Sequence, residues 1–256
     1  MLVQLSDLHL RAGSDGAGPA RRLRRALGAV DELQPRPSAV LLSGDIADSP
    51  SQEAYELAQE LLAPLGLPLH AIPGNHDDPV LLGAHFPEAS PAGDPPRLVF
   101  VCGDLRVVGL DSSVRGSDAG ALGVEQLAWL DQTLSLESDM PTLLALHHPP
   151  VLTGIGSMDA IALAPHDRSA LEELLRRHHH VAAVTCGHVH TSMVTTFAGR
   201  PLIICASVNS TVELDLRPRD DLPFAVASRP VGFLVHALID GRLVSHFQPL
   251  DRQAES

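Results

Sequence analysis

Histidine, aspartate and asparagine residues occur in five short groups whose members could bind metal ions. These groups contain Asp7 and His9, Asp45 and Asp48, Asn75 and His76, His147 and His148, and His188 and His190. Imidazole nitrogens together with carboxylate and amide oxygens suit borderline ions such as iron, manganese or zinc, and no cysteine lies in any group. A single Asp or His is more often a helix cap or a satisfied core residue. All five groups together predict a metal site.

Each group directly follows a short apolar run, and nine such runs are typical of strands in an α/β fold. Because the carboxyl ends of strands in such sheets share one edge, five groups can converge there. If the chain stays extended, Asp7 and His9 lie on one side of it, as do His188 and His190. The runs are residues 1–5, 39–42, 69–72, 98–101, 106–110, 142–146, 181–185, 202–206 and 232–239.

Segments with helical spacing of apolar residues separate several of these runs. Four amphipathic helices are predicted to pack on the sheet, and three stretches rich in turn-forming residues are predicted to be loops. No internal repeat interrupts the pattern, so residues 1–256 are predicted to form one domain. The helices are residues 19–33, 51–62, 123–136 and 167–177, and the loops are residues 86–96, 153–159 and 217–230.

Composition limits the classes of partner. All 18 basic residues are arginine, and against 31 acidic residues they give a net charge of -13, which disfavours nucleic acid and anionic membranes as partners. No apolar stretch is long enough for a membrane span, and the first residues lack the features of a secretory signal. We therefore expect a cytoplasmic protein, with Cys102, Cys186 and Cys205 as buried thiols.

The blocks DxH, GDxxD, GNHD, H and GHxH, between residues 7 and 190, resemble the calcineurin-like metallophosphoesterase superfamily. The segments at residues 5–10, 110–114 and 146–151 are most similar to bacterial class III cyclic nucleotide phosphodiesterases. The resemblance implies a four-layer α/β/β/α sandwich, in which two mixed sheets are flanked by helices. It also implies two divalent metal ions, or a mixed iron and manganese pair, and leaves a homodimer as a mild preference.

The resemblance further implies a role for each matching residue. His76 would contact the phosphoryl oxygens or protonate the leaving group, oriented by Asp48, and Asn75 would also contact substrate. His148 is expected beside the metals or facing the substrate, without binding an ion. One metal would be held by Asp7, His9 and His190, the other by Asn75, His147 and His188, with Asp45 bridging the two.

The implied reaction is hydrolysis of a phosphodiester, with 3',5'-cyclic AMP converted to AMP as the favoured example. Alternatives are a glycerophosphodiesterase, a 2',3'-cyclic nucleotide phosphodiesterase and a nucleotide pyrophosphatase. A nuclease would need a basic surface, which the net charge disfavours. A non-catalytic scaffold would tolerate missing ligands, whereas every ligand position is filled here.

Other conspicuous residues are given structural interpretations. Asp77 and Asp78 are predicted to cap a following turn. The three histidines at residues 178–180 are predicted to lie at the end of a helix. The arginines within residues 21–25 are predicted to lie on a solvated helix face. Arg115 and Met158 are expected at the surface, without a firm place in the site.

Overall fold

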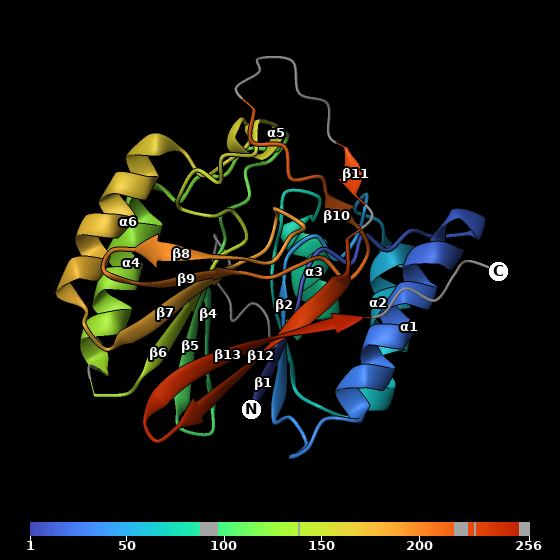
Figure 1. Ribbon diagram of the computed structural model, residues 1–256, viewed down its shortest axis with the longest axis horizontal. Helices are drawn as coiled ribbons and strands as arrows, with labels where there is room; N and C mark the ends of the chain where they lie inside the picture. The colour runs from blue at the N-terminus through green and yellow to red at the C-terminus, as the bar shows by residue number, and fades with distance from the viewer. Residues whose placement is uncertain (88–96, 138, 218–224, 228, 251–256) are drawn as a thin grey trace.

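Two β-sheets lie face to face between layers of helices in the computed structural model, which describes residues 1–87, 97–137, 139–217, 225–227 and 229–250 (Figure 1). In the first sheet β1, β2 and β3 are parallel, and β12 runs antiparallel to β1 and β13. Its order is β13 (Arg242–Leu250), β12 (Val231–Ile239), β1 (Leu2–Leu5), β2 (Ala39–Ser43) and β3 (Leu69–Ile72).

The second sheet has a parallel centre and antiparallel edges, with β5, β6, β7 and β9 parallel and β4 and β8 antiparallel to their neighbours. A separate two-stranded sheet pairs β10 (Thr211–Val212) antiparallel with β11 (Val226–Ala227). The order of the second sheet is β4 (Arg97–Cys102), β5 (Leu105–Leu110), β6 (Thr142–Ala145), β7 (Val181–Cys186), β9 (Arg200–Ile204) and β8 (Met193–Phe197).

Helices cover the outer face of each sheet, so the layers follow the predicted order α/β/β/α. The first sheet packs against α1 (Ala17–Asp31) and α2 (Gln52–Leu62), and the second against α4 (Gly123–Leu136) and α6 (Pro165–Arg177). Shorter elements are α3 (Pro79–His85), α5 (Gly156–Asp159) and the 3-10 turns η1 (Ser14–Gly16) and η2 (Ala63–Leu65). No helix in the described ranges is both long enough and apolar enough to cross a membrane.

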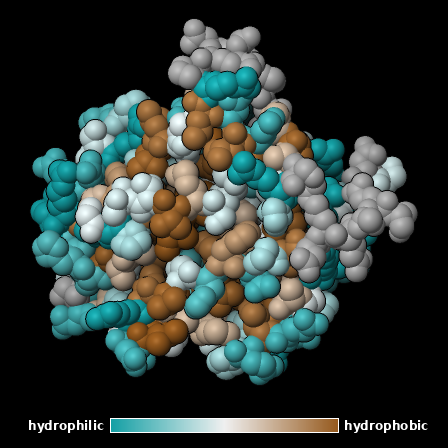
Figure 2. All heavy atoms as spheres, viewed as in Figure 1, coloured by the Kyte–Doolittle hydropathy of each residue, from teal (hydrophilic) through white to brown (hydrophobic). Residues whose placement is uncertain are grey.

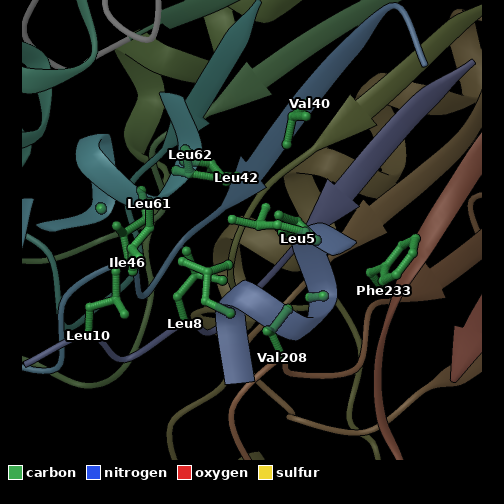
Figure 3. Close-up of a cluster of buried hydrophobic side chains, with 14 of the residues drawn as sticks. Leu5, Leu8, Leu10, Val40, Leu42, Ile46, Leu61, Leu62, Val208 and Phe233 are labelled. Atoms are coloured by element: carbon green, nitrogen blue, oxygen red, sulfur yellow. The ribbon is translucent and has the colours of Figure 1, made fainter. Parts of the chain in front are cut away.

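The side chains of the first sheet sort by the two-residue period of a strand. Leu5, Val40, Leu42 and Phe233 face α1 and α2, and they form a cluster with residues of the loops beyond the strands (Figure 3). Their neighbours along the strands, such as Leu41, face the second sheet. The outer surface of the flanking helices α4 and α6 is mainly hydrophilic, while apolar atoms gather over the middle of the molecule (Figure 2).

All nine apolar runs are found in strands, and all four predicted helices form, with α4 keeping its predicted bounds. Ser51 caps α2 by accepting a hydrogen bond from the Ala54 amide. The prediction of a loop over residues 153–159 is partly wrong, because Gly156–Asp159 forms α5. Most of the loop predicted at 86–96, and part of that at 217–230, lies outside the described residues. The three cysteines are buried free thiols, as predicted.

A buried polar network crosses the space between the two sheets. The Gln4 amide of β1 donates to the Ser43 hydroxyl at 2.8 Å, and its Oε1 accepts from the Thr185 hydroxyl of β7 at 2.6 Å. The same Oε1 lies 2.9 Å from Nε2 of His236, whose Nδ1 lies 2.7 Å from the Ser245 hydroxyl. An amide oxygen only accepts, so Nε2 of His236 carries a hydrogen, and burial favours the neutral ring by lowering its pKa.

This network gives the protein a dependence of stability on pH. Burial lowers the pKa of His236 to about 4, whereas the same group has a pKa of about 6.5 when the chain is unfolded. As pH falls through this window only the unfolded chain takes up the proton, so folding stability is lost. Between about pH 7 and about pH 5 we expect a loss of about 2 kcal/mol from this residue. Urea unfolding of the parent and His236→Gln at both pH values checks this, and equal losses in the two proteins would contradict it.

Candidate dinuclear metal site

The five groups from the ends of β1, β2, β3, β6 and β7 meet at one edge of the sandwich. Nε2 of His9 lies 3.0 Å from Nε2 of His190 and 3.6 Å from Oδ2 of Asp45. The same Asp45 oxygen lies 3.4 Å from Nε2 of His147. Around them, Asp7 Oδ1 is 3.4 Å from His190 Nε2, and the Asn75 side-chain oxygen is 3.1 Å from Nδ1 of His188. Residues 181 positions apart in the sequence thus share one buried site.

The donor atoms form two clusters that have Asp45 in common. Within each cluster the possible ligand atoms all lie within 4.8 Å of one another. Nε2 of His147 and Nε2 of His188 are buried with no hydrogen-bond partner among the described residues, and a buried polar atom without a partner is costly unless something else binds it. The residues therefore fit a pair of metal ions. The clusters are Asp7, His9, Asp45 and His190, and Asp45, His147 and His188.

The chain does not stay extended where it supplies these side chains, so the alternation expected for the DxH and GHxH segments is wrong. Positive φ angles occur at Asp7 (55°), His9 (45°), Asp45 (52°), His188 (68°) and His190 (58°). With this left-handed backbone, Asp7 and His9 reach the same cluster, whereas His190 reaches that cluster and His188 reaches the other one. The reason lies in the pairing of the loops: the Asp7 amide donates to the Gly44 carbonyl at 3.0 Å, and the His9 amide to the Asp45 carbonyl at 2.9 Å.

Glycines let these loops approach closely, as their positions in the motifs suggest. At Gly74 an added Cβ would collide with Oδ1 and the amide nitrogen of Asp45, and at Gly44 with the ring of His147. Gly44 also has a φ of 98°, which favours glycine. At Gly187 an added Cβ would collide with the Ser6 hydroxyl. These three positions therefore require glycine, because a Cβ atom would collide with the neighbouring loops of the site.

A methyl group at Gly74 should damage the site from within. We expect Gly74→Ala to lower stability by about 1 to 3 kcal/mol, because the backbone and carboxylate of Asp45 must move. Gly28→Ala is the matched control: nothing lies within 4 Å of an added Cβ there, in the last turn of α1. The free energy of unfolding of that variant should rise by about 0.5 to 1 kcal/mol. Thermal unfolding measures both, and a Gly74→Ala protein as stable as the parent would contradict the expectation.

Charge interactions set the protonation of the ligands. Burial by itself raises the pKa of Asp7, but the charge and hydrogen bond of His190 outweigh it and bring the pKa to about 2. His147 outweighs burial in the same way and holds the pKa of Asp45 well below its usual range. Burial and the charge of His147 lower the pKa of His188 to about 3. The neighbouring histidines thus keep both buried carboxylates ionised, and bound cations would supply the same kind of compensating charge.

His76 and Asp48 lie beside the clusters, in an arrangement that differs in part from the expected one. The His76 amide donates to Oδ1 of Asp45 at 2.9 Å, and the rings of His76 and His9 meet edge to face with centroids 4.8 Å apart. Nδ1 of His76 lies 2.7 Å from the main-chain carbonyl of Asp48, so the carboxylate is not the orienting group. The carboxylate of Asp48 faces His9 and Arg11 instead.

His148 stands behind the clusters, and both of its ring nitrogens have partners. Nε2 donates to the Asp118 carbonyl at 3.1 Å, which leaves Nδ1 to accept from the Ser112 hydroxyl at 2.8 Å. Its ring packs on that of His188 with centroids 4.5 Å apart, and burial holds its pKa well below the usual range. Neutral and fully engaged, His148 supports the ring of His188.

Sequence reasoning missed several residues that shape the site. Asp77 does not cap a turn as predicted; its buried carboxylate accepts from the Ile46, Ala47 and Gly74 amides and from the Tyr55 hydroxyl. Burial raises its pKa to about 6, with Asp45 adding to the effect. Asp77 therefore fastens the loop that carries Asp45 to the loop that carries Asn75. Only the GNHD block pointed to it. Asp78 caps α3, as predicted.

The segment after β9 also contributes, although it carries no motif legible in the sequence. The Ser207 hydroxyl donates to the Asp7 carbonyl at 2.8 Å, and the Ser210 hydroxyl lies 3.2 Å from Nδ1 of His190. Nearby, Arg22 of α1 donates to the side-chain oxygen of Asn209 at 2.8 Å. The serines thereby orient two candidate ligands from a third chain segment.

The remaining residues singled out in the sequence lie elsewhere. His178 follows the end of α6 with Nε2 2.6 Å from the Asp131 carboxylate, and residues 178–180 contribute to none of the clusters in the described ranges. Arg115 is exposed and lies 3.5 Å from Asp78. Met158 is buried in the core against α4 and α6, so its predicted surface position is wrong.

Comparison with known proteins places this geometry in a family. Residues 1–192 match the family model described as calcineurin-like phosphoesterase. The chain is 36% identical over 223 residues to a probable glycerophosphodiester phosphodiesterase of Arcobacter nitrofigilis, which covers 85% of this chain and 81% of the relative. It is 37% identical over 207 residues to a probable cyclic nucleotide phosphodiesterase of Synechococcus sp., which covers 78% of this chain and 79% of the relative.

A solved structure shares the fold. The crystal structure of a dimetal phosphatase from Danio rerio superposes with a TM-score of 0.71, covering 98% of this chain and 96% of that chain at 17% identity. Two mixed sheets flanked by helices are thus common to both. The matching family model spans every candidate ligand from Asp7 to His190, and members of this family use a dinuclear metal centre. The chain belongs to the calcineurin-like phosphoesterase family.

Proposed function

We propose that the protein hydrolyses small phosphodiesters at this site, with 3',5'-cyclic nucleotides as the favoured substrates. The observation that carries the proposal is the pair of donor clusters that share Asp45, with His76 directly beside them. Two divalent ions held together clamp the attacking and leaving oxygens of an in-line displacement. Such a site is suited to breaking a phosphorus–oxygen bond.

Seven residues would hold the two ions, with Asp45 shared between them. The donor set of imidazole, carboxylate and amide suits iron, manganese or zinc, and the buried cysteines lie outside both clusters. The first ion would be held by Asp7, His9 and His190, and the second by Asn75, His147 and His188.

The ions, when bound, polarise the phosphoryl group and make water a nucleophile at neutral pH. His76 serves the other end of the reaction. Because its Nδ1 donates to the Asp48 carbonyl, the ring is fixed and Nε2 is left to face the substrate. As water adds to phosphorus it loses a proton, and as the ester bond breaks Nε2 of His76 delivers a proton to the leaving alkoxide; the ring is then reprotonated from solvent. Asn75 and His76 would also contact the phosphoryl oxygens.

The substrate class rests on the relatives and on charge. The Synechococcus relative is named as a cyclic nucleotide phosphodiesterase, which supports cyclic AMP as a substrate. A net charge of -13 argues against a nucleic acid polymer, since such binding relies on basic surface. The name of the Arcobacter relative supports a second candidate, a glycerophosphodiester. Both substrates carry one phosphodiester and would use the same residues.

Hydrolysis assays with the manganese-loaded protein test these candidates. The substrates are 3',5'-cyclic AMP, glycerophosphoethanolamine and the artificial diester bis(p-nitrophenyl) phosphate, with Asp45→Ala as the blank. Turnover of cyclic AMP and the artificial diester, lost in the variant, is expected. Turnover of the glycerophosphodiester without cyclic AMP would replace the favoured substrate by the second candidate. No turnover of any diester with two ions bound would overturn the proposed function.

A further inference from the structure

We propose that Arg11 and Asp48 form a positioning pair that holds His9 in the orientation its metal site requires. The inference rests on the proposed function, because it assumes that His9 binds one of the two ions. It assigns a role to Arg11, which lies outside the motifs, and a second role to Asp48 besides its main-chain contact with His76.

The imidazole of His9 is held between Asp48 and the site. Oδ1 of Asp48 lies 3.2 Å from Nδ1 of His9, on the side of the ring that faces away from the clusters. The opposite nitrogen, Nε2, lies 3.0 Å from His190 and 3.6 Å from Asp45. The contact with Asp48 is at an ion-pair distance and is not aligned as a hydrogen bond. A carboxylate this close still favours the tautomer with its hydrogen on Nδ1, which leaves the lone pair of Nε2 for a metal ion. His9 is buried, whereas the carboxylate of Asp48 is partly exposed to solvent.

Arg11 holds the same carboxylate by both oxygens. Its Nε lies 3.0 Å from Oδ2 of Asp48, and a terminal guanidinium nitrogen donates to Oδ1 at 3.2 Å. A planar guanidinium that donates to both oxygens fixes the plane of the carboxylate, which a single bond does not. The direction of Oδ1 toward His9 is therefore set by Arg11.

Backbone pairing between the two segments brings Arg11 and Asp48 together. Leu10 and Ala47 form a parallel bridge, and the Asp48 amide donates to the Leu10 carbonyl at 2.9 Å. Arg11 and Asp48 each follow one member of that bridge. The segment that carries His9 and the segment that carries Asp45 thus place Arg11 and Asp48 side by side.

Orientation outweighs charge in this pair. The Arg11 side chain is 53% exposed and that of Asp48 26%, so solvent and salt screen their Coulombic effect on the ions. Geometry is not screened in this way. A lysine at position 11 would keep the charge but lose the two-pronged contact, which separates the two effects experimentally.

Manganese titration of the metal-free protein, followed by calorimetry and by electron paramagnetic resonance, tests the inference. Asp48→Asn should weaken one of two binding steps by about 10- to 100-fold, the usual loss when a metal-binding histidine loses its carboxylate partner. Arg11→Met and Arg11→Lys should both weaken the same step by about 3- to 10-fold, since neither side chain forms the fork. The matched control is Arg115→Met, which removes another exposed arginine whose 3.5 Å partner, Asp78, caps α3.

Each outcome decides a different point. Variants that bind both ions like the parent would overturn the positioning role while leaving the proposed function intact. A parent protein that binds no manganese pair would instead contradict the proposed function. If Arg11→Lys bound manganese as tightly as the parent, the charge of Arg11, and not its orientation of the carboxylate, would explain its effect on metal affinity. A third bound ion in the parent, lost in Asp48→Asn, would mean that His9, Asp48 and His76, which also lie within 4.8 Å of one another, bind a metal themselves.

Discussion

Asp45→Ala is expected to lose about a thousandfold or more in kcat/KM toward any phosphodiester and to bind fewer than two metal ions. Asp45 belongs to both donor clusters, so its removal takes a ligand from each at once. Its Oδ2 faces Nε2 of His9 and of His147, and its Oδ1 accepts from the His76 amide. The substitution also leaves His147 without the carboxylate that balances it.

Metal analysis beside kinetics separates loss of the site from loss of the fold. Asp45→Asn, which keeps the volume of the side chain, should also lose kcat/KM and bound metal. Its circular dichroism spectrum should remain that of a folded protein. Asp104→Ala, in the exposed turn between β4 and β5, is the control and should leave both measurements unchanged. An Asp45→Ala protein that keeps two ions and a tenth of its activity would exclude a bridging role.

His76→Ala is expected to lower kcat by about 100- to 10,000-fold while both metal ions stay bound. The residue lies beside the donor clusters that share Asp45, and its Nδ1 is already engaged with the Asp48 carbonyl. Removal of the ring therefore takes away a proton donor and leaves the seven candidate ligands in place. A leaving group that needs no protonation, such as p-nitrophenolate, should suffer less than an alkoxide.

The comparison of leaving groups makes this prediction specific. The ratio of kcat for bis(p-nitrophenyl) phosphate to that for cyclic AMP should rise in His76→Ala. Exposed His166 on α6 offers the control variant, His166→Ala, with an unchanged ratio. Loss of an ion in His76→Ala would show that His76 is a ligand and not the acid.

Much of the fold is legible in the sequence because its central strands are buried on both faces. Val40, Leu42 and Leu144 lie in continuous apolar runs, which mark such strands without ambiguity. The strand β13 was missed because it is partly exposed and mixes Arg242, Ser245 and Gln248 with apolar residues. The edge strand β8 was missed for a similar reason. Pattern reasoning finds the centre of a sheet more readily than its borders.

The sequence predicted which residues form the candidate site, but not how the backbone and the contacts around them are arranged. The positive φ angles at Asp7 and His188 arise from the pairing of loops distant in sequence, which no local pattern encodes. The contacts of Asp77 and Ser210 depend on tertiary structure in the same way. Asp48, expected to orient His76, contacts it through its main-chain carbonyl, while its carboxylate faces His9.

The left-handed backbone of the candidate ligands has a thermodynamic consequence. Residues other than glycine in this region each cost on the order of 1 kcal/mol, and five of the seven candidate ligands adopt it. The sandwich of sheets carries that cost before any ion arrives. Metal binding then requires little rearrangement of the chain, and part of the folding stability has been exchanged for a preorganised coordination sphere. Selection for function and selection for stability oppose each other at these five positions.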